Sequence, residues 1–65
     1  MDGGRKSEGQ GTVEALLRAG RELFARCGYD GASVRAITAR AGANLGAITY
    51  HFGSKRAFYN QVVET

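Results

Sequence analysis

The fold is decided by one stretch of the sequence, Ala41-Gly42-Ala43-Asn44-Leu45-Gly46-Ala47-Ile48-Thr49-Tyr50-His51-Phe52-Gly53-Ser54-Lys55. Gly42 is expected to end one short helix, and Asn44 is expected to cap the next, which is predicted over 45–52. Ile48 and Phe52 lie four residues apart, so they share the face that anchors this helix. Two short helices joined by a tight turn that contains glycine are typical of a helix-turn-helix unit.

Upstream of this stretch, small and apolar residues recur at spacings of three and four, which predicts an amphipathic helix over 12–27. The stripe consists of Val13, Leu16, Leu17, Gly20, Leu23, Phe24 and Cys27. Thr12 is expected to cap this helix and Gly28 to end it. Because Cys27 falls in the stripe, it is interpreted as a small core residue; the alternative is a redox sensor.

Two further helix starts are marked by serine. Ser33 is expected to cap a helix over 33–41, and Ser54 to open a fourth helix over 54–65. The inward face of that fourth helix is expected to hold Ala57, Phe58, Gln61 and Val62. Its apolar pattern is still in phase at the last residue, so we expect the chain to be the front part of a longer protein. The predicted fold is all-α, a three-helix bundle with a helix-turn-helix and the start of a connecting helix.

Residues 1–11 contain four glycines and no apolar residue after Met1, so they are predicted to form a flexible arm preceding a domain over 12–65. This N-terminus lacks the apolar stretch of a secretory signal. The longest uncharged run, 41–54, is too polar to span a membrane. We therefore expect a cytoplasmic domain without a membrane partner.

The size and composition exclude several classes of protein. A chain of 65 residues is marginal as a single domain, and its one Cys forms no internal disulfide. One His and one Cys provide no metal-ligand spacing, and no nucleophile or paired acid is evident near that His. We predict no enzyme activity, no metal and no cofactor.

The charge is unevenly distributed. The formal net charge is +3, but no Asp or Glu occurs from Gly31 to Val63, a segment that carries Arg35, Arg40, Lys55 and Arg56. An acid-free basic segment is expected for a polyanion partner, since neutralised phosphates release condensed counterions. The alternative from charge alone is a solvated basic face.

The helix over 45–52 has the properties of a DNA-reading helix. Its start is small or polar, and its outer face offers hydroxyl and imidazole groups. The candidates for base reading are Asn44, Leu45, Gly46, Ala47 and Tyr50. Gly46 costs about 1 kcal/mol of helix propensity relative to Ala, which suggests close approach of another backbone or of a base edge. The alternative is that Gly46 continues the loop and the helix starts later.

The same residues resemble the helix-turn-helix signature of the TetR family of bacterial transcriptional regulators, above all in His51-Phe52-x-Ser54-Lys55. Upstream, Leu23-Phe24 with Gly28-Tyr29, and Ser33-Val34 with Ile37, agree with the family pattern. Two positions depart from it. Thr49 stands where many members have Tyr, and Leu45 stands where many have a polar residue.

The resemblance implies a homeodomain-like fold and sequence-specific binding of double-stranded operator DNA, most often by a repressor, with the 45–52 helix in the major groove. It also implies a homodimer whose C-terminal domain, absent here, binds a small-molecule inducer. Such a regulator is bacterial and cytoplasmic, and is associated with the nucleoid when bound. The alternative function is a helical protein-interaction module with no DNA role, in which Leu45 and Tyr50 anchor a partner.

Candidate phosphate contacts follow from the motif and from helix starts, where free N–H groups favour anions. They are Ser33, Arg35, Thr49, His51 and Lys55, with Arg5 and Lys6 of the arm as further candidates. Four of them have an alternative: Ser33 as a cap alone, His51 packed against the turn, and Lys55 and Arg35 in water.

Overall fold

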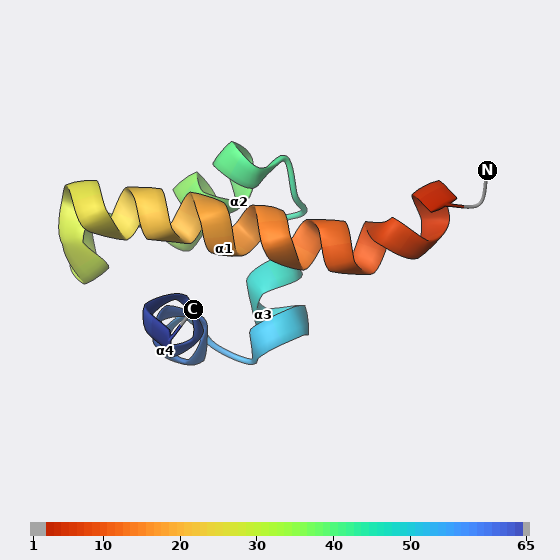
Figure 1. The fold of residues 1–65 in the computed structure, drawn as a ribbon. Helices are drawn as coiled ribbons and strands as arrows, with labels where there is room; N and C mark the ends of the chain where they lie inside the picture. The colour runs from red at the N-terminus through yellow and green to blue at the C-terminus, as the bar shows by residue number, and fades with distance from the viewer. Residues whose placement is uncertain (1–2, 65) are drawn as a thin grey trace.

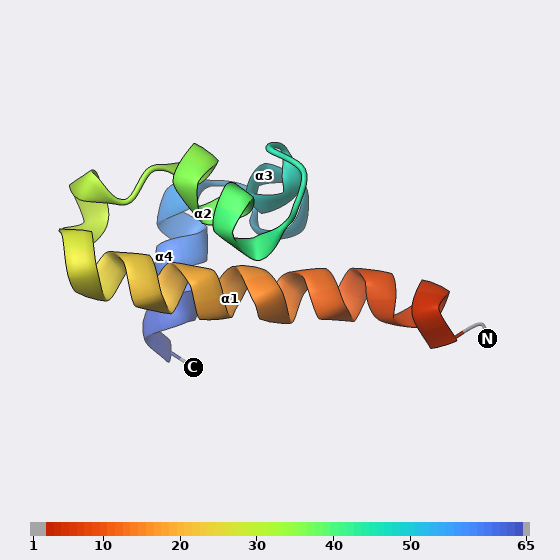
Figure 2. The same ribbon diagram turned by 90° about the horizontal axis from the view of Figure 1, so that it is seen from above.

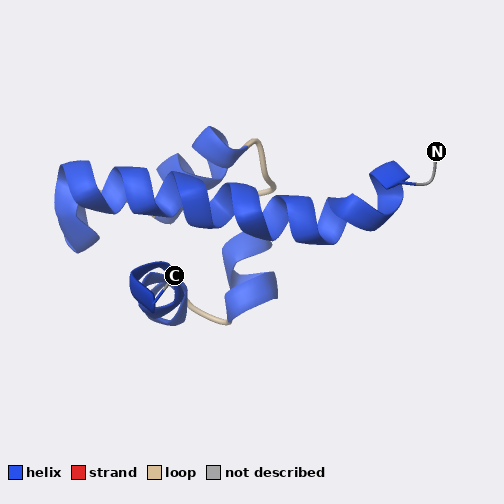
Figure 3. Cartoon of the chain, viewed as in Figure 1, coloured by secondary structure: helices blue, strands red, loops and turns tan. Residues whose placement is uncertain are grey.

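The computed structural model describes the backbone of residues 3–64 and the side chains of residues 11–64. It contains four helices in this range: α1 (Gly3–Gly31), α2 (Val34–Ala41), α3 (Ala47–Phe52) and α4 (Lys55–Glu64) (Figure 1). The described residues contain no strand, and short loops join the helices (Figure 3). The all-α class and the order of helices are therefore as predicted.

The helices are arranged around the long rod of α1. α2 and α4 both pack on α1, and α3 packs on α4 and α2. Viewed from above, α2 and α3 lie to one side of α1 while α4 crosses it (Figure 2). The principal extents are 39 × 20 × 17 Å, and the long dimension follows α1. The helix-turn-helix is thus supported from behind by two other helices.

The first helix starts earlier than the sequence suggested. α1 begins at Gly3, so Thr12 lies inside the helix and is not its N-cap, and residues 3–11, predicted as a flexible arm, are helical. The physical reason is cooperativity: once a packed segment nucleates a helix, adding a residue needs no new nucleus. Residues 1–2 lie outside the described range.

The helical path of α1 is broken at Gly28, which has φ 80° and ψ 174°. The break confirms that the regular rod ends at Cys27. One more turn follows, in which the Ala32 amide donates to the Gly28 carbonyl at 3.1 Å. The interpretation of Cys27 as a core residue was wrong, because its side chain is exposed. It is in phase with the apolar stripe but lies almost one turn past Phe24, the last α1 residue in the core.

The core is formed by all four helices and one loop residue. Its buried members are Leu16, Ala19, Phe24, Ala32, Ile37, Ala47, Ile48, Phe58 and Val62. Phe52 and Tyr59 are half-buried against it, close to expectation. Ala57 and Gln61 were expected to face inward, but both are exposed. The buried face of α4 is narrower than predicted and consists of Phe58 and Val62.

The crossing of α1 and α4 depends on a glycine. Gly20 is buried, and a Cβ atom built there would lie 2.5 Å from Cζ of Phe58. The ring of Phe58, itself fully buried, therefore occupies the space that a side chain at Gly20 would need. This contact fixes how closely α4 approaches α1.

Candidate nucleic-acid interface

The turn between α2 and α3 is built by backbone hydrogen bonds. Gly42 has φ 71° and ψ 29°, the left-handed conformation that glycine adopts without strain. Its amide donates to the Ala39 carbonyl at 3.2 Å, and the Ala43 amide donates to the Thr38 carbonyl at 2.8 Å. This pair is a Schellman motif, which ends α2 and redirects the chain toward α3.

The start of α3 differs from the prediction. α3 begins at Ala47 and not at Leu45, and its N-cap residue is Gly46. The Asn44 Oδ1 atom accepts a hydrogen bond from the Gly46 amide at 2.9 Å, and the Asn44 carbonyl accepts one from the Ala47 amide at 2.9 Å. Asn side chains compete with helix formation in this way, so Asn44 caps a turn and the helix follows it. The alternative interpretation of Gly46, that it continues the loop, is the one observed.

The outer edge of the turn and of α3 is open to solvent. Tyr50 is 84% exposed and Leu45 is 49% exposed, so both large side chains project from the fold. An open groove of about 670 Å³ runs along this edge. It is lined by Thr12, Gly42, Ala43, Asn44, Gly46, Ala47, Tyr50 and His51.

Four of the five base-reading candidates thus gather at one groove: Asn44, Gly46, Ala47 and Tyr50. Ala47 is only 8% exposed, so its methyl group packs into the core and does not project outward. Leu45 lies outside the groove lining but is exposed at the same turn.

The phosphate candidates on α2 and α3 are mostly accessible. Ser33 is exposed, and its Oγ accepts the Ala36 amide at 3.0 Å, so the predicted cap is confirmed. Arg35 and Thr49 are exposed on α2 and α3. His51 is half-buried, with its ring 4.9 Å from that of Tyr50 and 6.4 Å from that of Phe52, in edge-on contacts.

Lys55 has a partner within the fold. Its Nζ donates to the Tyr29 carbonyl at 2.7 Å and lies 4.4 Å from the centroid of the Tyr29 ring. A charged donor bonded to a carbonyl and placed over an aromatic face is stabilised twice. Lys55 therefore ties the start of α4 to the end of α1, a role that its position in the motif did not indicate.

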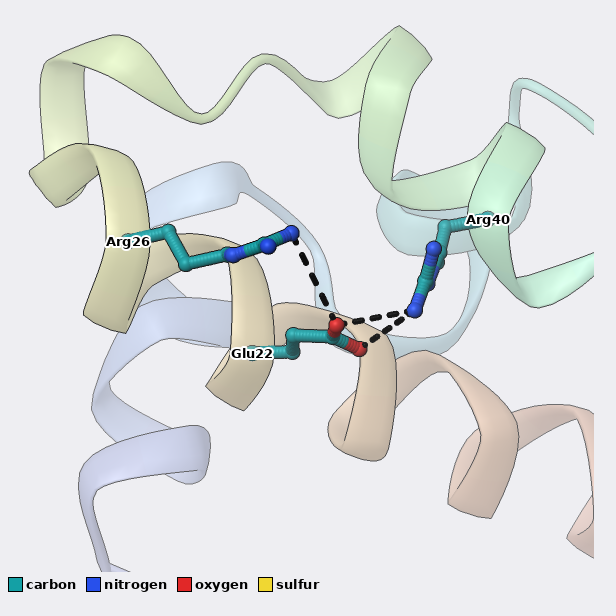
Figure 4. A network of polar contacts seen from close by, with 3 residues as sticks. All are labelled: Glu22, Arg26 and Arg40. Carbon is teal, nitrogen blue, oxygen red and sulfur yellow. Dashed lines mark hydrogen bonds and ion pairs between the residues drawn. The ribbon is translucent and has the colours of Figure 1, made fainter.

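The basic residue at the end of α2 is also paired. Arg40 donates from one guanidinium nitrogen to both carboxylate oxygens of Glu22, at 2.8 and 2.9 Å (Figure 4). Glu22 also faces Arg26, one turn later on α1, at 3.9 Å. The shorter contact of Glu22 is therefore the one that joins α1 to α2.

Arg5 and Lys6 were candidates in the N-terminal segment, and their side chains lie outside the described residues. Within the range that the structure describes, no helix is both long and apolar enough to cross a membrane. The same range holds no group of three His, Cys, Asp or Glu side chains suited to a metal ion.

Sequence reasoning left two residues out of the site candidates. Thr12 comes from α1 but lines the groove. Arg56 is exposed, and its guanidinium carbon lies 5.2 Å from the centroid of the Tyr29 ring. The acid-free segment contained Arg56, so its charge was a usable signal. Nothing in the sequence pointed to Thr12, because its position depends on how α1 crosses the turn.

Comparison with known proteins identifies the family. Residues 16–62 match the family model described as bacterial regulatory proteins, tetR family. The chain is 39% identical over 46 residues to the HTH-type transcriptional repressor AcnR of Corynebacterium efficiens, covering 71% of this chain and 24% of the relative. It is 33% identical over 58 residues to the HTH-type transcriptional regulator UidR of Escherichia coli K12, covering 89% and 30%. It is 41% identical over 49 residues to the HTH-type transcriptional repressor DhaR of Mycobacterium sp. strain GP1, covering 75% and 25%.

The chain spans between 24% and 30% of the length of these three relatives. No solved structure matches it significantly. The family model nevertheless covers most of the chain, from the middle of α1 to the last turn of α4. The chain therefore belongs to the TetR family of bacterial regulatory proteins.

Proposed function

We propose that this chain binds double-stranded DNA in a sequence-selective way, with α3 in the major groove. It would act as the DNA-reading part of a transcriptional repressor. The observation that carries the proposal is the exposed edge of α3 and its preceding turn, where Leu45 and Tyr50 project beside an open groove. The major groove is about 12 Å wide and admits a single helix. Exposed Gly46, at the start of α3, adds no side chain that would keep the helix from the base edges.

The charge around this edge favours a polyanion. The segment from Gly31 to Val63 has no acidic residue, so no carboxylate of α2, α3 or the turn repels a phosphate. Arg35 on α2 and Arg56 on α4 are exposed. We assign them to the phosphates on either side of α3, together with Thr49 and the Ser33 end of α2. Each phosphate neutralised should release counterions, so binding should weaken as salt rises.

The two half-buried phosphate candidates are His51 and Lys55. His51 is half-buried beside Tyr50, and we propose that it contacts a phosphate through the edge that remains exposed. Lys55 is half-buried and bonded to Tyr29, so we propose that it supports the interface and contacts a phosphate secondarily.

For the whole protein we propose a homodimer that binds a small-molecule inducer through a region beyond this chain, acts in the bacterial cytoplasm at the nucleoid, and has no catalytic activity. The names of the relatives, two repressors and one regulator, support the regulatory part of this proposal. A dimer would place two copies of α3 on half-sites about one helical turn apart.

The test is a binding titration of the intact protein that carries this sequence against a randomised duplex pool, followed by titrations of the selected duplex at increasing salt. Tyr50→Ala should weaken selective binding at least tenfold and leave thermal stability unchanged, because the side chain is 84% exposed. Val63→Ala is the matched control, since Val63 is 64% exposed on α4. If no duplex is selectively bound, the proposal fails. Recognition of an acidic peptide by residues 44–55 would then favour the interaction module.

A further inference from the structure

The reading edge contains no charged side chain. From Ala41 to Ser54 the sequence holds no Lys, Arg, Asp or Glu, and this run includes the whole turn and all of α3. The large side chains that the edge exposes are Leu45 and the ring of Tyr50. The same edge exposes the smaller polar side chains of Asn44 and Thr49, so its apolar surface is concentrated at Leu45 and the Tyr50 ring.

The nearest basic side chains on either side of this run are held elsewhere. Arg40 is bonded to both oxygens of the Glu22 carboxylate on α1. Lys55 is bonded to the Tyr29 carbonyl. The usual way to specify guanine is a bidentate contact from Arg or Lys to its O6 and N7 atoms. These bonds hold both cations toward α1, so a bidentate contact to guanine would have to come from their remaining N–H groups.

The amide of Asn44 is also committed in part. Its Oδ1 accepts from the Gly46 amide, and this bond shapes the turn. A bidentate contact to adenine needs that oxygen as the acceptor for the adenine N6 amino group. Asn44 thus keeps Nδ2 as a donor and one lone pair of Oδ1 as an acceptor, but the bond to Gly46 fixes the direction of its amide.

We propose that the operator half-site is specified chiefly by thymine, through contact of its C5-methyl group with Leu45 and the ring of Tyr50. Among the groups displayed in the major groove, the thymine methyl is the apolar one, so it is the match for the exposed Leu45 side chain and Tyr50 ring. The inference rests on the proposed function, since it names the base chemistry that the same edge reads.

The test replaces thymine by deoxyuridine, one position at a time, in the duplex selected by the intact protein. Deoxyuridine keeps the base pair and removes only the methyl group. For the unmodified protein, at least one replacement should weaken binding by about fourfold, the effect of exposing one buried methyl to water. The same replacement should have little effect on Leu45→Ala or Tyr50→Ala protein, whichever residue contacts that methyl.

The controls separate this inference from the proposed function. Val63→Ala protein should respond to deoxyuridine as the unmodified protein does, because Val63 lies on α4 outside the reading edge. Selective binding that no deoxyuridine replacement weakens would overturn the inference and leave the proposed function standing. The inference would also be overturned if deoxyuridine weakened binding by the Leu45→Ala and Tyr50→Ala proteins as much as it weakens binding by the unmodified protein. The methyl group would then act through DNA shape and not through contact with either side chain. Absence of any selective binding would overturn both.

Discussion

Replacing Gly20 by alanine tests the closest helix contact of the fold. The new Cβ would lie 2.5 and 2.7 Å from two ring carbons of Phe58, and 3.1 Å from Cγ2 of Val62. Both neighbours belong to α4 and are buried, at 0% and 7% exposure. Neither side chain has free space to move into, so the strain must be relieved by shifting α4 away from α1.

Two effects of opposite sign decide the magnitude. Alanine is favoured over glycine inside a helix by about 1 kcal/mol. Overpacking a core typically costs ~1–3 kcal/mol. The two distances to Phe58 are shorter than real Cβ contacts, which places the cost in the upper part of that range. The free energy of unfolding of Gly20→Ala should therefore fall by about 1–2 kcal/mol after the propensity gain is subtracted.

The assay is denaturant unfolding followed by circular dichroism, with Gly11→Ala as the matched control. Gly11 lies in the same helix but is exposed, so its replacement should stabilise the chain by up to about 1 kcal/mol. The two variants should thus move the unfolding midpoint in opposite directions. If Gly20→Ala raises the midpoint as Gly11→Ala does, the described approach of α4 to α1 is wrong. A second check combines Gly20→Ala with Phe58→Leu. In the Phe58→Leu background, Gly20→Ala should lower the free energy of unfolding much less, since the ring atoms that the new methyl meets are gone.

Three further substitutions address the other contacts. Ile48→Ala should lower the free energy of unfolding by about 2–4 kcal/mol, because Ile48 is 0% exposed; a loss under ~1 kcal/mol in chemical unfolding would show that α3 is not anchored there. Lys55→Met should lower it by ~1–2 kcal/mol through loss of the bond to Tyr29, and the loss should appear without DNA; a variant of unchanged stability and weaker DNA binding would point to a phosphate role alone. Arg40→Met should cost less than about 1 kcal/mol, because the pair with Glu22 is partly exposed, and the cost should shrink in high salt; a salt-independent loss would contradict an ionic origin.

The features that the sequence predicted correctly are local ones. Ser33 accepts from an amide three residues later and Ser54 does the same for Ala57 at 3.1 Å, so both caps follow from short-range chemistry. Gly42 and Gly53 both have positive φ where helices were expected to end. The apolar period placed Ile48 and Phe58 inside.

The features that the sequence did not predict depend on competition between two local structures or on contacts between residues far apart in the chain. The start of α3 was misplaced because the Asn44 side chain can cap either a helix or a turn. The sequence alone does not show which of the two is more stable. Cys27 has the right phase but its side chain is exposed, and the phase alone does not show which positions of α1 the other helices cover. The partner of Lys55 is 26 residues away, and no spacing rule connects it to Tyr29.

The arrangement of the candidate site residues, as distinct from their role, was predicted to a similar extent. Position along the chain brought Asn44, Gly46 and Tyr50 to one edge, because they belong to one turn and one helix face. The burial of Ala47 was not predictable, since it depends on how α3 tilts against the core.

The ring of Phe58 has a consequence for how movement passes through the domain. It lies in the notch left by Gly20 on α1, 5.9 Å from the ring of Phe24, and its centroid is 4.9 Å from that of Phe52 at the end of α3. A tilt of α4 would either leave a void at the notch or press on Phe52. The orientation of α3 is therefore coupled to that of α4 by steric contact, and a displacement of α4 would reach α3 through the contact between the Phe58 and Phe52 rings, among others.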